Sequence, residues 1–143
     1  MNINVLVELV CDDLEITIPE IKYDSKKFNS KTQLASLVIE KNGKKVLYLR
    51  KKYNDMITMM FSVCHELRHK YQIDNLIFNF DDYKTSSNLS KREYNMQPEE
   101  IDANAYGYLI MIREFGIEIK FNGLDRDIID MIKSRAKEIS KEH

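Results

Sequence analysis

A central helix is predicted by residues 54–73, which read NDMITMMFSVCHELRHKYQI. Apolar side chains recur there mostly every three or four residues, which is the pattern of an amphipathic helix. Asn54 or Asp55 can cap its first turn, because a short polar side chain accepts hydrogen bonds from the free amides of a helix start. The apolar face comprises Met56, Met59, Met60, Val63 and Leu67.

An H-E-x-x-H motif, His65-Glu66-Leu67-Arg68-His69, lies inside this predicted helix. Residues four apart share a helix face, so His65 and His69 project side by side and can hold one zinc ion. Glu66 is near enough to act as the general base for a water that attacks a carbonyl. The alternative is a surface helix that carries two solvated histidines. We also expect a buried Cys64 and a solvated Arg68.

A third zinc ligand is sought downstream, because a catalytic zinc takes three protein ligands and keeps one position open. Residues 100–104, Glu100-Ile101-Asp102-Ala103-Asn104, lie at the start of the next predicted helix. On spacing alone, Glu99 and Asp102 compete with Glu100 for the ligand role. These acids also suit the positive end of a helix dipole, which requires no metal. After an H-E-x-x-H helix we favour the ligand interpretation.

Together the two motifs resemble the gluzincin pattern, H-E-x-x-H followed by E-x-x-A-[DN]. The chain is most similar to the small versions, the minigluzincins and the ImmA/IrrE-type proteins, over about residues 50–110. The resemblance implies a zincin-like fold and a zinc metallopeptidase. Its ligands would be His65, His69 and Glu100, and its catalytic base would be Glu66.

The resemblance also implies supporting roles. Asp102 or Asn104 could orient a ligand histidine, and Tyr94 and Tyr106 are candidates for assisting transition-state stabilisation. In that family a peptide pairs with the edge strand of the sheet, which points here to the strand around Val46–Arg50. A different class of function is a catalytically idle zinc-bound module that regulates or binds, for example, a DNA-binding repressor.

The first half of the chain is expected to form strands. Short apolar or alternating runs predict them at residues 4–10, 14–18, 34–40 and 45–51. Asn42-Gly43 separates the last two and favours a hairpin with a type I′ turn.

The second half of the chain is expected to form helices. Pro98 starts a helix that runs to about Phe115, with Gly116 as its cap, and Asp125 opens a third helix. Residues 74–97 are less regular, with a loop at 85–88. A sheet that precedes its helices is an α+β order, here expected as one zincin-like domain over residues 1–143.

Composition limits the classes of partner and the cellular compartment that we expect for this chain. The chain has 143 residues, is 43% hydrophobic and carries a net charge of −1, so it can bury a core and lacks the basic excess of most nucleic-acid-binding proteins. Two cysteines form no disulfide framework, and no stretch predicts a signal peptide or a membrane span. We therefore expect a cytoplasmic protein whose partner is a peptide or protein substrate, with no membrane and no direct nucleic-acid contact.

Overall fold

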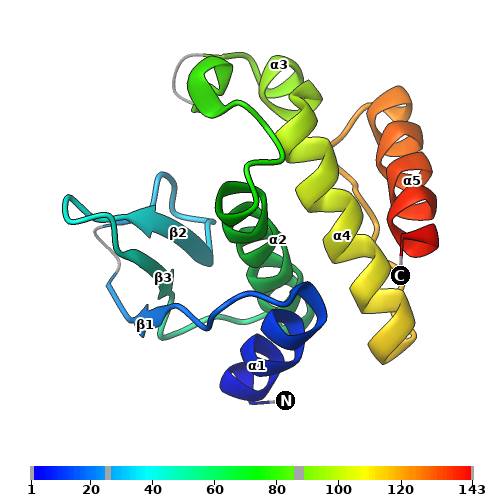
Figure 1. Cartoon of the computed structure of the whole chain (residues 1–143). Coiled ribbons are helices and arrows are strands. Elements are labelled where there is room, and N and C mark those ends of the chain that lie inside the picture. The colour runs from blue at the N-terminus through cyan, green and yellow to red at the C-terminus, as the bar shows by residue number, and fades with distance from the viewer. Residues whose placement is uncertain (1, 25–26, 86–88, 143) are drawn as a thin grey trace. The chain divides into compact units, whose positions relative to one another are not determined.

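The chain is an α+β protein in the computed structural model, which describes residues 2–24, 27–85 and 89–142 (Figure 1). The expected loop at 85–88 lies largely outside the described residues. The chain divides into two units, Met1–Asp74 and Asn75–His143, and each is described by itself. The elements in chain order are α1 (Ile3–Leu14), β1 (Glu20–Lys22), β2 (Ala35–Ile39), β3 (Lys45–Leu49), α2 (Met56–Asp74), η2 (Phe80–Asp82), α3 (Lys91–Met96), α4 (Pro98–Phe115) and α5 (Arg126–Lys141).

The N-terminal unit begins with a helix, so the strand expected at residues 4–10 is wrong. The strand expected at 14–18 is wrong too, because α1 includes Leu14 and residues 15–18 form no strand. Asn2 caps α1 by accepting the Asn4 amide at 2.8 Å, and Glu15 ends it in the left-handed region at a φ of 55°. The buried positions follow the period of a helix and cover one face of it, which packs against α2. They are Leu6, Val7, Val10, Cys11 and Leu14.

The hairpin of β2 and β3 is confirmed, with Leu37 opposite Leu47 in an antiparallel register. Its turn differs from the expected type I′, which needs positive φ at both central residues. The Gly43 amide donates to the Glu40 carbonyl at 2.9 Å, and Gly43 has a φ of 84° whereas Asn42 does not have positive φ. A three-residue loop with glycine in its last position therefore closes the hairpin.

The three strands are ordered β1-β3-β2, with β1 parallel and β2 antiparallel to β3. Because β3 is paired on both sides, the expected edge strand at Val46–Arg50 is wrong. Among the described residues β2 is an outer strand. The carbonyl of Leu34, the residue before β2, accepts the Arg50 amide, which follows β3, at 2.9 Å. Backbone groups alternate in direction along a strand, so the even-numbered residues of β2 face β3 and the backbone groups of Leu37 face away from it.

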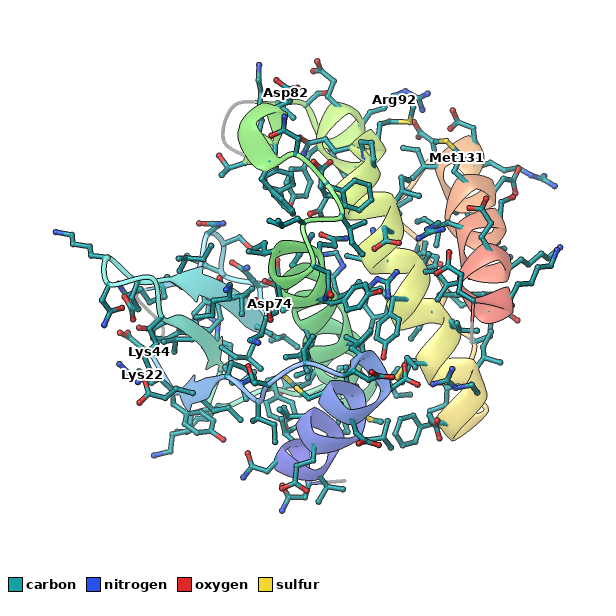
Figure 2. All side chains as sticks on the ribbon, in the orientation of Figure 1. Lys22, Lys44, Asp74, Asp82, Arg92 and Met131 are labelled. Atoms are coloured by element: carbon teal, nitrogen blue, oxygen red, sulfur yellow. The ribbon has the colours of Figure 1, made fainter. Side chains whose placement is uncertain are left out.

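The motif helix α2 forms as predicted and begins after Asp55. This carboxylate accepts the amides of Ile57 and Thr58 at 3.0 and 3.2 Å, which satisfies two free donors of the first turn. Met59 and Val63 lie in the core, and the helix packs against α1 and β2. At its last residue, labelled in Figure 2, Asp74 forms ion pairs with Lys45 and Lys70.

The C-terminal unit is helical. The predicted bounds of α4 are confirmed, and Gly116 ends it at a φ of 66°. Asp125 precedes α5, which lies beside α4 and buries Ile128, Ile132, Ala136 and Ile139 (Figure 1). One short helix, α3, was not expected, and Ser90 and Glu93 form a capping box at its start. In the part of the chain that the structure describes, no helix has both the length and the apolar character needed to cross a membrane.

Candidate metal centre

The two motif histidines face each other on α2. The Nε2 atoms of His65 and His69 are 3.1 Å apart, and the two rings meet edge to face with centroids 4.7 Å apart. Both side chains are largely removed from solvent, with His69 only 9% exposed. The alternative of two solvated histidines on a surface helix is therefore wrong.

This spacing fits a tetrahedral metal. Two imidazole nitrogens bound to one zinc ion at about 2.0–2.1 Å are separated by roughly 3.3 Å. The observed separation of the His65 and His69 nitrogens, 3.1 Å, differs from that value by a few tenths of an ångström. Small side-chain rotations bring both nitrogens to ligand distance, so this pair could hold a zinc ion.

Gln72 orients His69, one of the candidate ligands, and the sequence interpretation did not include Gln72. Its side-chain Oε1 lies 2.9 Å from His69 Nδ1, and Gln72 is completely buried. Donation of the Nδ1 proton to this oxygen leaves the Nε2 lone pair facing His65, which is the tautomer that binds a metal. The signal was available in the sequence, because position 72 is three residues beyond His69 and shares its helix face.

Glu66 is held between the histidine pair and the sheet. One carboxylate oxygen accepts the Leu37 amide of β2 at 2.7 Å, and the other lies 3.7 Å from His65 Nε2. The side chain is 15% exposed, so it combines contact with the site and access to water. A carboxylate in this position can accept a proton from a water molecule beside the histidine nitrogens.

Cys64, directly before the motif, and Arg68, within it, are both buried. Cys64 is buried as predicted, and burial raises the pKa of its thiol to about 12, which disfavours the thiolate that a metal requires. The expectation of a solvated Arg68 is wrong, because this residue is 1% exposed. Its guanidinium lies 4.4 Å from the centroid of the Tyr71 ring, a cation–π contact within the same helix.

The predicted third ligand, Glu100, lies in the C-terminal unit, in the first turn of α4. It is buried, and its Oε2 accepts the hydroxyl of Tyr83 at 2.8 Å. Tyr83 also lies 3.2 Å from the Tyr94 hydroxyl. Burial, the charge of Glu100 and the contact with Tyr94 raise the pKa of Tyr83 far above its ordinary value, so it stays a hydrogen-bond donor.

The two tyrosine candidates differ in exposure. Tyr94 on α3 is half-buried and belongs to the Tyr83 and Glu100 network. Tyr106 on α4 is completely buried. Tyr83 was not among the expected site residues, because it follows η2 in a stretch without regular pattern and only tertiary structure brings it to Glu100.

The two acids that compete with Glu100 for the ligand role, Glu99 and Asp102, also lie on α4. Asp102 is buried and accepts the Arg135 guanidinium of α5 at 2.8 Å, so its carboxylate is engaged in joining these two helices. Glu99 and Asn104 are buried as well. The ion pair of Asp102 makes it a weaker candidate for a metal ligand than Glu100.

Comparison with known proteins yields no relative: no protein-family model, no curated protein and no solved structure matches the chain. The chemistry of the chain's own residues is therefore the basis for proposing a function.

Proposed function

We propose that this chain is a small zinc-dependent peptidase with a zincin-like fold. His65 and His69 would hold the zinc, and Glu100 would supply the third ligand. The observation that carries the proposal is the pair of histidine nitrogens 3.1 Å apart, with a carboxylate of Glu66 beside them. The residue types agree with it, because imidazole and carboxylate are ordinary ligands of catalytic zinc.

A bound zinc would supply Lewis acidity, which polarises a substrate carbonyl and makes water more acidic. The chain's own residues do the rest. Glu66 would take a proton from the attacking water and return it to the leaving amine. Gln72 would hold His69 in the binding tautomer, and Tyr83 would hold the carboxylate of Glu100. Tyr94 or Tyr106 remains our candidate for stabilising the charge that develops on the carbonyl oxygen.

The substrate we propose is a peptide paired with β2. This outer strand has residue Leu37 facing away from β3, and its amide contacts Glu66 at 2.7 Å. A peptide added along β2 would therefore bring its backbone to the general base. Strand addition recognises backbone groups, so we expect broad acceptance of side chains.

Zinc stoichiometry by native mass spectrometry is the first test. We expect one zinc per wild-type chain, and weaker retention in Glu100→Ala and in His69→Ala. Glu66→Gln should keep the zinc and lose cleavage of an unbiased peptide library. A wild-type chain that stays free of metal in added zinc would refute the proposal. Zinc binding without cleavage in the wild type would leave the idle regulatory module as the better function.

A further inference from the structure

The C-terminal unit contains a groove of about 780 Å³ that is distinct from the predicted metal ligands. One wall is α5, and the other is made by the residues before η2, the end of α3 and the start of α4. Its apolar lining residues are Ile77, Phe78, Met96, Pro98, Ile101 and Met131. Figure 2 labels Met131 on the α5 wall.

Apolar side chains at this groove are exposed to water. Ile77 is 41% exposed and Met96 is 37% exposed, although both are large and apolar. Leu76, the residue before Ile77, is 86% exposed and has a φ of 53°, which is unusual for a leucine. Apolar side chains that line a groove are typical of ligand-binding sites, and methionine side chains adapt to varied partners.

The charges around the groove define what fits it. Asp102, Glu138 and Glu142 share the single guanidinium of Arg135, at 2.8, 3.5 and 3.4 Å. Asp130, at the other end of the α5 wall, is exposed. The charged lining residues are therefore three acids, Asp102, Asp130 and Glu138, and one base, Arg135, and this acidic excess favours a ligand that is apolar on one face and basic at its margins.

The spacing on α5 indicates the length of that ligand. Asp130 and Glu138 are eight residues apart on one helix, which corresponds to about 12 Å or two helical turns. Two turns of a bound helix present apolar side chains at positions i, i+4 and i+7 along one face. Basic residues just outside those positions reach the two carboxylates.

We propose that this groove binds an amphipathic helix of a partner protein, with apolar side chains in the groove and lysine or arginine opposite Asp130 and Glu138. The site lies in the C-terminal unit alone and does not depend on the proposed peptidase activity.

A display library of random sixteen-residue peptides tests the proposal. The library is selected on the full-length chain and counter-selected on the Met131→Glu variant. We expect the surviving peptides to carry apolar residues at i, i+4 and i+7 with flanking lysine or arginine. The proposal would be overturned if the selected peptides were acidic, or if no peptide bound the wild-type chain more tightly than the Met131→Glu variant.

Fluorescence anisotropy with the best peptide then locates its contacts. Met131→Glu and Met96→Glu should each weaken binding at least tenfold, and so should the double reversal Asp130→Lys with Glu138→Lys. Ile112→Glu, a change on α4 at a residue that does not line the groove, should alter affinity less than twofold. Circular dichroism confirms that each variant is folded. Equal losses of peptide affinity in the groove variants and in Ile112→Glu would refute the site. A wild-type chain that forms a dimer, which Met131→Glu dissociates, would also refute it.

Discussion

Replacing Gln72 by leucine tests whether Gln72 supports metal binding by the histidine pair. The change removes the oxygen that accepts His69 Nδ1 at 2.9 Å and keeps a side chain of similar size. Loss of such a supporting hydrogen bond typically lowers metal affinity about 10–100-fold, or about 1.4–2.7 kcal/mol. Because Gln72 is completely buried, solvent has little opportunity to replace the lost acceptor, and we expect the upper part of this range.

Competition with a zinc chelator of known affinity measures the effect. Gln72→Glu retains an acceptor for Nδ1 and should stay within a few-fold of the wild type. Gln33→Leu is a matched control, because this glutamine also belongs to the N-terminal unit and its amide donates to the Ala35 carbonyl of β2. Thermal unfolding of the metal-free proteins shows that the variants fold. Equal zinc affinity in the wild type and Gln72→Leu would refute the orienting role of Gln72.

Three further predictions concern stability. Gly116→Ala should lower the free energy of unfolding by about 1–2 kcal/mol in urea titrations, because Gly116 has a φ of 66° and no neighbour within 4 Å of an added Cβ; an unchanged midpoint would contradict this. Met59→Ala should cost about 2–5 kcal/mol in the same assay, because Met59 is 1% exposed, and a loss below 1 kcal/mol would show that the site collapses. Burial raises the pKa of Asp74, but Lys45 and Lys70 outweigh burial and hold that pKa below its ordinary value. The stabilisation by these ion pairs is therefore complete above about pH 4 and is lost as pH falls through the folded-state pKa. Asp74→Asn should remove this part of the acid dependence of the free energy of unfolding, and identical acid profiles of the two proteins would contradict the ion pairs.

Local signals account for the elements that were predicted. The caps at Asp55 and Gly116 act within one turn of the backbone, and so does Pro98 at the start of α4. The hairpin likewise depends on Asn42-Gly43 between two apolar runs. Each of these features is determined by residues close together in sequence, so a single sequence displays it.

The N-terminal helix shows where such signals conflict. Valine and isoleucine between residues 3 and 10 favour strands, yet Leu6, Val7 and Val10 are buried with the spacing of a helix. Burial against α2 outweighs an intrinsic preference of a few tenths of a kcal/mol per residue. In this segment the helical period of the apolar residues, and not their β-branched composition, indicates the element that forms.

The candidate site likewise contains residues that local sequence predicts and residues that only the tertiary structure brings together. The motif pair and Glu66 follow from helix geometry alone, and so does Gln72, three residues after His69. The partner of Glu100 does not, because Tyr83 lies in a stretch without periodicity and is 17 residues away. The order of strands was also unreadable, because it depends on the parallel pairing of β1 with β3 across a long connection.

In the proposed peptidase, the hydrogen bond from the Leu37 amide to Glu66 would couple substrate arrival to the state of the general base. That amide is an outward donor in the middle of β2, so a peptide strand that pairs there competes with the carboxylate for one proton. Pairing of a peptide with β2 would release Glu66 from the Leu37 amide, whereas a strand that leaves this amide unused would leave Glu66 bound to it. The Leu37 amide resonance and its rate of hydrogen exchange would therefore report, in a single residue, which of the two acceptors is engaged.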